Sequence, residues 1–186
     1  MLDNIIHKKY NFNNYNIETV DNIFSLDSRL KYYSTFKKSN FYIGWEDTSE
    51  IEVQHYKYLH SIYNEADLRK LGLVEDILLS DFGKRLFDNY NIKRGVLNLS
   101  KPGDFYLNHT HGDDTVLLYY ANIRWQEEWS GETLFFNDSM KEILFATPYI
   151  PGRIVLFDGK IPHTIISQSI IAPHYRFTFT LFLAKK

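Results

Sequence analysis

The order of hydrophobic and polar residues changes character near residue 94 of the chain. From there onward, short apolar or alternating runs are separated by turn-forming pairs such as Pro102-Gly103, Pro151-Gly152 and Asp158-Gly159. This pattern is typical of β-strands joined by tight turns. It predicts strands over Arg94–Leu99, Asp104–His109, Thr115–Ala121, Glu132–Phe136, Glu142–Thr147, Arg153–Phe157, His163–Gln168 and Tyr175–Ala184. Such a succession of short strands favours a β-sandwich or jelly-roll barrel.

The first half of the chain has a mixed and partly helical pattern. Apolar residues recur at helical spacing over Ile17–Leu30 and Ser49–Tyr63, and Ser80 is suited to be the N-cap of a third helix. The short apolar run Asn40–Trp45 predicts a strand. We therefore expect a mostly β (α+β) fold in a single domain, residues 1–186. Its helix-bearing part, residues 1–93, packs on one sheet of a jelly-roll core, residues 94–186.

Composition and charge narrow the classes of function. Hydrophobic residues make up 44% of the chain and aromatic residues 17%, enough to fill a sizeable core. The 21 basic and 23 acidic residues give a formal net charge of −2. This argues against a dedicated nucleic-acid binder, because such a protein needs a basic surplus. No apolar run reaches the length of about 18 residues that spans a membrane, and the N-terminus lacks the apolar core of a signal peptide. We therefore expect a cytoplasmic protein with no membrane partner.

The absence of cysteine restricts the metal chemistry of the chain. Without thiols there can be no disulfide, zinc-thiolate site, iron–sulfur cluster or thiol nucleophile. Any metal ion must therefore be bound by histidine and carboxylate side chains.

One group of residues has the spacing of such a metal site. His109, His111 and Asp113 follow one another at intervals of two residues, so in an extended chain their side chains lie on the same face. His163 begins a later predicted strand. Two imidazole nitrogens and one carboxylate form the facial triad typical of non-haem Fe(II), which leaves positions open for other ligands. The alternative, polar surface residues beside a turn, explains the repeated spacing less well.

Arg176 is a charged residue at the start of an otherwise almost wholly apolar predicted strand. In that strand it shares one face with Thr178 and Thr180. An arginine facing the barrel interior is a costly buried charge unless an anion meets it, and its planar guanidinium suits a carboxylate. The alternative from the pattern alone is an arginine that pairs with a protein carboxylate such as Asp158, or one that points to solvent.

Several segments of the second half occur in the order and spacing of a known family. These segments are Pro102–Phe105, Thr115–Asn122, Trp129–Phe136, Pro151–Phe157, His163 and Arg176–Thr178. In this arrangement the chain resembles the Fe(II)/2-oxoglutarate-dependent oxygenases, specifically the branch similar to prolyl 4-hydroxylases, over about residues 94–184. The resemblance implies a double-stranded β-helix (jelly-roll) fold with the metal in its mouth.

The resemblance also implies a metal ion, a cosubstrate and a reaction. Fe(II) would be chelated by the 1-carboxylate and 2-oxo groups of 2-oxoglutarate. Arg176 would bind the distal carboxylate of 2-oxoglutarate, with Tyr120 and Thr178 as hydroxyl partners. The reaction would consume O2, release succinate and CO2, and hydroxylate either an amino-acid residue, such as proline, in a peptide or protein, or a small molecule.

The family's His-X-Asp motif fits this chain in two registers. His111-Gly112-Asp113 gives the expected triad, completed by His163. His109-Thr110-His111 fits the distance from Gly103 but places histidine where the carboxylate belongs. We favour Asp113 over His109, because a carboxylate keeps the site closer to charge neutrality. His109 is the alternate ligand.

Two other positions depart from the family, and two other functions stay open. Ser130 replaces a glycine common in that turn, and many prolyl hydroxylases carry lysine in place of Arg176, which weakens the case for proline as substrate. One alternative is a cupin-like metalloprotein that uses no 2-oxoglutarate and is built on three histidines, His109, His111 and His163. The other is a non-catalytic jelly-roll binding module. Arg176 on the barrel interior would favour the oxygenase over both.

Overall fold

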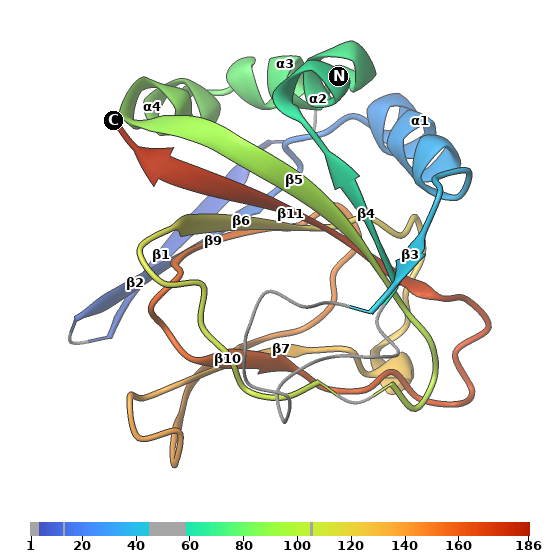
Figure 1. The fold of residues 1–186 in the computed structure, drawn as a ribbon, viewed down its shortest axis with the longest axis vertical. Helices are drawn as coiled ribbons and strands as arrows, with labels where there is room; N and C mark the ends of the chain where they lie inside the picture. Colours follow the sequence, from blue (N-terminus) through green and yellow to red (C-terminus); the bar gives the residue numbers. More distant parts are fainter. Residues whose placement is uncertain (1–3, 13, 45–58, 105) are drawn as a thin grey trace.

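The computed structural model contains a large antiparallel sheet, a small antiparallel sheet and a layer of helices (Figure 1). It describes residues 4–12, 14–44, 59–104 and 106–186. In spatial order, the large sheet consists of β1 (Ile6–Phe12), β2 (Tyr15–Asp21), β9 (Ile154–Asp158), β6 (Thr115–Tyr120), β11 (Arg176–Lys185), β5 (Tyr90–Ser100), β4 (Leu59–Tyr63) and β3 (Tyr42–Ile43). The small sheet consists of β10 (His163–Ile165), β7 (Thr133–Phe136) and β8 (Ile143–Thr147).

The helices cover one face of the large sheet, and the small sheet lies on its other side (Figure 1). These helices are α1 (Leu26–Phe36), α2 (Glu65–Leu71), α3 (Leu73–Leu78) and α4 (Asp81–Asn89). A separate short 3-10 helix, η2 (Glu127–Trp129), precedes β7 in the chain. Within the described ranges, no helix is long and apolar enough to cross a membrane. The arrangement confirms the predicted jelly-roll architecture with helices on one sheet.

Strand β11 shows how the two faces of the large sheet divide. Phe177, Phe179 and Leu181 belong to the core beneath the helices, whereas Phe182 belongs to the core between the two sheets. The side chains of alternate residues point to opposite faces of a sheet. Arg176 and Thr178 therefore face the barrel interior together with Phe182, and both are completely buried.

The predicted strands of the second half are confirmed with one exception. The segment Asp104–His109 forms no strand in its described residues, and Phe105 lies outside them. His109 forms only an isolated antiparallel bridge to His163. The turn Lys101–Asp104 is closed instead by a backbone bond and by the Asp104 carboxylate, which accepts from the Lys101 N–H at 2.8 Å.

The first half contributes strands to the large sheet as well as helices. The predicted helix Ile17–Leu30 is wrong in its first part, because residues 17–21 belong to strand β2. Helix α1 begins only at Leu26. Its N-cap is Ser25, whose side chain accepts a hydrogen bond from the Ser28 N–H at 3.1 Å. Strand β2 lies between β1 and β9, so Ile17 and Val20 are buried on opposite faces. Short apolar runs buried on both sides do not distinguish strand from helix.

Three other predictions from the first half have separate outcomes. The N-cap at Ser80 is confirmed, since its hydroxyl accepts from the Gly83 N–H at 3.0 Å at the start of α4. The strand within Asn40–Trp45 is β3, although Trp45 lies outside the described residues. The predicted helix Ser49–Tyr63 is wrong where it can be checked, because Leu59–Tyr63 is strand β4, paired with β5; residues 49–58 lie outside the described part.

Gly95 permits the close packing of β5 against the helices. A Cβ at this position would lie 2.6 Å from the ring of Phe179 and 3.3 Å from Leu68. We expect Gly95→Ala to lower the free energy of unfolding by about 1–3 kcal/mol through overpacking, measured by urea titration. Asn91→Ala, at an exposed position of the same strand, should change it by less than about 0.5 kcal/mol. Equal effects of the two substitutions would contradict this account.

Candidate metal and cosubstrate site

Three histidines converge at one end of the barrel. A nitrogen atom from each of His109, His111 and His163 lies within 4.8 Å of the others. The backbones of His109 and His163 exchange two hydrogen bonds of 3.0 Å, and the His111 N–H donates to the Gly159 carbonyl at 2.6 Å. Main-chain bonds therefore bring together histidines that are about 50 residues apart in sequence.

The hydrogen bonds of the rings leave nitrogen lone pairs for a metal. Nδ1 of His109 lies 3.0 Å from the Leu107 carbonyl, and Nδ1 of His163 lies 2.9 Å from the Ile161 carbonyl. A ring that donates from Nδ1 to a carbonyl presents Nε2 as an acceptor, as metal-bound histidines commonly do. The Nε2 atoms of His163 and His111 are 3.2 Å apart. Two ligands at right angles, each about 2.1 Å from one ion, would be about 3 Å apart.

Burial keeps the imidazoles of His111 and His163 neutral, and neutral imidazole is the form that binds metal. Burial lowers the pKa of His111 to about 3, with smaller contributions from His109 and Arg94, and it lowers the pKa of His163 well below its usual value. Desolvation disfavours the imidazolium because the charged form loses its hydration. Phe157 and Phe182 supply apolar surroundings, since each ring contacts one of the histidines.

Asp113 lies outside this group. Its side chain is 91% exposed, and its carboxylate lies 2.7 Å from the Lys160 ammonium, whose hydrogen bond lowers the pKa of Asp113. The chain turns at Gly112, which has a φ of +62°. The alternation that would place Asp113 beside His111 therefore ends before it reaches Asp113. Of the two registers considered from the sequence, the structure brings together the ligands of the three-histidine set.

Arg176 is completely buried and its guanidinium is only partly satisfied. Its Nε donates to the Gly131 carbonyl at 3.1 Å, and its terminal carbon lies 4.8 Å from the centre of the Tyr149 ring. The terminal nitrogens Nη1 and Nη2 have no hydrogen-bond partner among the described residues. The predicted alternatives, an exposed arginine or one paired with Asp158, are not what the structure shows.

Tyr120 and Thr178, the two hydroxyl residues expected near Arg176, differ in whether their hydroxyl groups are hydrogen-bonded. The Tyr120 ring centre is 5.6 Å from the guanidinium carbon, while the Tyr120 hydroxyl donates to Thr133 Oγ1 at 2.8 Å. Thr178 is completely buried, and its Oγ1 has no partner among the described residues. Two unsatisfied terminal nitrogens and a nearby free hydroxyl are donors that fit a carboxylate.

Strand β7 and the residues before it connect the two parts of the site. The Phe135 ring lies 6.0 Å from His163, Thr133 accepts from Tyr120, and the preceding Gly131 holds Arg176. The sequence interpretation missed the roles of Gly131 and Tyr149. It also missed Asn98, whose buried Oδ1 has no partner among the described residues. A polar residue in a predicted apolar strand, the signal that marked Arg176, was present at Asn98 as well.

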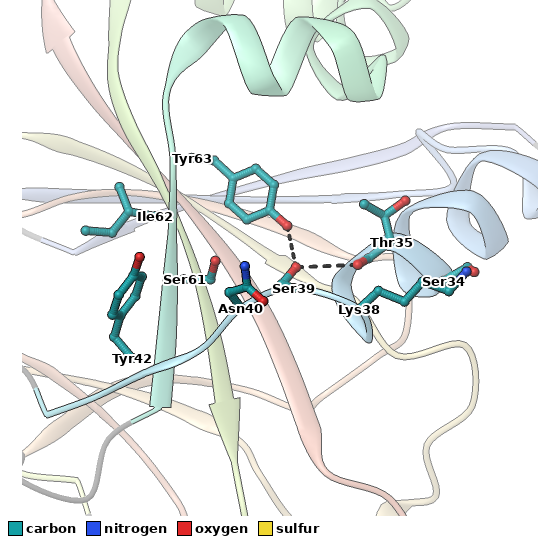
Figure 2. Close-up of a pocket in the computed structure, with 9 residues that line it drawn as sticks. All are labelled: Ser34, Thr35, Lys38, Ser39, Asn40, Tyr42, Ser61, Ile62 and Tyr63. Atoms are coloured by element: carbon teal, nitrogen blue, oxygen red, sulfur yellow. Dashed lines mark hydrogen bonds between the residues drawn. The ribbon is translucent and has the colours of Figure 1, made fainter.

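A separate hollow of about 470 Å³ lies between the end of α1 and strands β3 and β4 (Figure 2). Its lining is mostly polar: Ser34, Thr35, Lys38, Ser39, Asn40, Tyr42, Ser61, Ile62 and Tyr63. The hydroxyls of Ser39 and Tyr63 satisfy each other at 2.5 Å (Figure 2). None of the lining residues belongs to the histidine group or to the surroundings of Arg176.

Solved structures share this fold at low sequence identity. A prolyl-4-hydroxylase from Pseudomonas putida matches with a TM-score of 0.65 and 15% identity over 89% of this chain and 91% of that chain. A prolyl hydroxylase from Trichoplax adhaerens, solved with a hypoxia-inducible factor peptide fragment, matches with a TM-score of 0.62 and 16% identity over 90% and 82%. A 2OG-Fe(II) oxygenase family member from Burkholderia pseudomallei matches with a TM-score of 0.62 and 11% identity over 88% and 82%.

No protein-family model and no curated protein sequence matches the chain. The likeness is therefore carried by the three-dimensional arrangement, and it agrees with the family that the sequence resembles. The chain has the jelly-roll fold of the prolyl hydroxylases and of the 2OG-Fe(II) oxygenase family.

Proposed function

We propose that this protein is an Fe(II)- and 2-oxoglutarate-dependent dioxygenase that hydroxylates an amino-acid residue in a peptide or protein, or a small molecule. The observation that carries the proposal is the buried Arg176, with two unsatisfied terminal nitrogens, in a barrel that also holds three converging histidines. An uncompensated buried charge destabilises a protein. Binding of a carboxylate would remove that cost, which gives the arginine a function rather than a structural role.

In this proposal His109, His111 and His163 hold the metal ion, and no protein carboxylate is needed. Imidazole is a suitable ligand for Fe(II), and three such ligands leave other positions of the ion open. In this ligand set, His109 takes the position that the sequence analysis favoured for Asp113. When bound, Fe(II) with 2-oxoglutarate and O2 supplies the oxidising chemistry, with succinate and CO2 as products. The protein's own contribution is to bind, orient and shield these groups.

Arg176 anchors the cosubstrate by its distal carboxylate. The two terminal nitrogens can donate two parallel hydrogen bonds, and Thr178 Oγ1 supplies a third donor. Burial raises the pKa of Tyr120, so its hydroxyl stays protonated and keeps its bond to Thr133. The surrounding aromatic rings exclude water, which strengthens the pairing of guanidinium with carboxylate.

A peptide is the substrate class that we propose to test first, although an epimerase from nogalamycin biosynthesis also shares the fold, with a TM-score of 0.64 and 9% identity over 90% of this chain and 77% of that chain. The Trichoplax enzyme was solved with a peptide fragment, and the Pseudomonas protein is a prolyl-4-hydroxylase. We extend this to the present chain as a proposal, with prolyl residues as the first to be tested. A panel of proline-containing peptides, scored by succinate formation and by a mass increase of one oxygen atom, is the direct assay.

A second candidate is a metalloenzyme that uses the three histidines without 2-oxoglutarate. The all-histidine cluster favours it, because such a set also suits ions other than Fe(II). It gives no role to the unsatisfied nitrogens of Arg176. The two candidates therefore differ in whether a 2-oxo dicarboxylate binds beside the metal.

Anaerobic binding of Fe(II) and 2-oxoglutarate distinguishes them. We expect a weak visible charge-transfer band when both are added, because chelation by the 1-carboxylate and 2-oxo groups places a ketone beside Fe(II). Succinate, which lacks the 2-oxo group, is the matched control and should give no band. Iron binding without a band would favour the second candidate. If the protein binds neither Fe(II) nor 2-oxoglutarate, both enzyme candidates are wrong and the non-catalytic binding module is the remaining function.

A further inference from the structure

Arg176 is held in place by a main-chain carbonyl rather than by an acidic side chain. Its Nε donates to Gly131 O at 3.1 Å. This bond uses the Nε–H of the guanidinium and leaves both terminal nitrogens without a partner among the described residues. An end-on fork of this kind binds a carboxylate through two parallel hydrogen bonds. The position of the Gly131 carbonyl therefore sets the direction of the fork.

The turn that carries this carbonyl is strained. Ser130 has φ of 54° and ψ of −151°, a backbone region that is almost confined to glycine and costs on the order of 1–3 kcal/mol for other residues. Gly131 follows with φ of +94°. A side chain at Gly131 would place its Cβ 3.1 Å from Arg176 Nε and 3.4 Å from the Trp125 ring. The turn therefore fits closely between the arginine and the tryptophan.

Trp125 holds the strained turn in position. Its indole N–H donates to the Ser130 carbonyl at 2.7 Å. The same ring packs on Tyr149 with ring centres 4.5 Å apart, and the Tyr149 ring centre lies 4.8 Å from the guanidinium carbon of Arg176. Trp125 thus reaches the arginine along two routes, through the Ser130–Gly131 backbone and through the Tyr149 ring. Strained backbone persists only where its surroundings fix it, and it occurs preferentially at functional sites.

We propose that Trp125 is a positioning residue, which fixes the Ser130–Gly131 turn so that Arg176 is oriented for the distal carboxylate of the cosubstrate. The inference rests on the proposed function. It assigns the tryptophan no contact with the cosubstrate. It predicts that loss of the indole N–H weakens binding of 2-oxo acids that carry a distal carboxylate, and leaves binding of 2-oxo acids without one unchanged.

The test compares two probes in the Fe(II)-loaded protein under anaerobic conditions. The probes are 2-oxoglutarate and 2-oxobutyrate, which chelates in the same way but has no distal carboxylate. The charge-transfer band gives the dissociation constant of each. For Trp125→Phe we expect the constant for 2-oxoglutarate to rise about five- to tenfold, the effect of one lost hydrogen bond. The constant for 2-oxobutyrate should change by less than about twofold. In turnover, KM for 2-oxoglutarate should rise while kcat is retained.

Trp129→Phe is the matched control. The Trp129 ring packs edge-on against Trp125, with ring centres 5.5 Å apart. The hydrogen bond to the Ser130 carbonyl, however, comes from Trp125, so Trp129→Phe leaves that bond in place. We expect both dissociation constants to stay at the parent values. If Trp125→Phe does not fold, Gly131→Ala tests the same turn, because the new Cβ displaces the arginine; it should also weaken only 2-oxoglutarate.

The outcomes separate this inference from the proposed function. If the unsubstituted protein gives no band with either probe, the proposed function fails and the inference with it. If the parent binds both probes and Trp125→Phe weakens neither, or weakens both equally, the positioning role is wrong and the proposed function stands. A selective loss of 2-oxoglutarate supports the inference.

Discussion

Replacing Arg176 with methionine is expected to weaken 2-oxoglutarate binding by at least about 30-fold and, at the same time, to stabilise the ligand-free protein. Removing one partner of a buried charge pair costs about 2–5 kcal/mol of binding. In the ligand-free protein the two terminal nitrogens are unsatisfied, so an apolar side chain of similar length relieves a cost of about 1 kcal/mol. Anaerobic titration measures the first effect, and thermal unfolding without ligand measures the second.

Arg153→Met is the control for this experiment. Arg153 pairs with both carboxylate oxygens of Asp21 at 2.7 Å, so its charge is already compensated. Its loss should destabilise the protein by about 1.5–3 kcal/mol, the usual contribution of hydrogen bonds to charged groups, and leave the affinity for 2-oxoglutarate unchanged. The two substitutions should therefore change the stability of the ligand-free protein in opposite directions, and only Arg176→Met should change the affinity for 2-oxoglutarate. If Arg176→Met instead lowers the stability of the ligand-free protein and leaves the affinity for 2-oxoglutarate unchanged, Arg176 has a structural role.

The second large effect concerns the proposed metal ligands. His109→Ala should weaken Fe(II) binding by more than the 10–100-fold that loss of an outer-shell partner costs, because it removes one of three nitrogens that converge within 4.8 Å. Asp113→Ala should leave the affinity within about twofold, because its carboxylate is exposed and paired with Lys160. Fe(II) titration with a competing chelator measures both.

The two substitutions also decide between the two registers of the histidine motif. His111→Ala and His163→Ala should behave like His109→Ala, since both histidines are ligands in either register. If Asp113→Ala loses iron and His109→Ala retains it, the triad with the carboxylate is correct. In that case the turn at Gly112 must rearrange when metal binds.

Much of the fold follows from local sequence patterns. On β11 the alternation of aromatic and polar residues reflects two different environments, the core under the helices and the barrel interior, so the strand was predictable. The Ser80 cap was predictable because a hydroxyl before a helix satisfies a backbone N–H within three residues. Strand β2 was not, since burial on both of its faces removes the alternation.

The sequence by itself determined the chemistry on which the site can draw. It has no cysteine, a His-X-His-X-Asp cluster with a distal histidine, and one arginine in an apolar strand. Only the tertiary structure decided how these residues are arranged. A single left-handed residue, Gly112, turns Asp113 to solvent, while the pairing of His109 with His163 across the barrel completes the three-histidine group. The link from Trp125 to Arg176 has no periodic pattern in the sequence, because it runs through a strained turn and an aromatic ring from a distant loop. Such contacts depend on backbone angles and on distances between remote segments, and neither is encoded in local spacing.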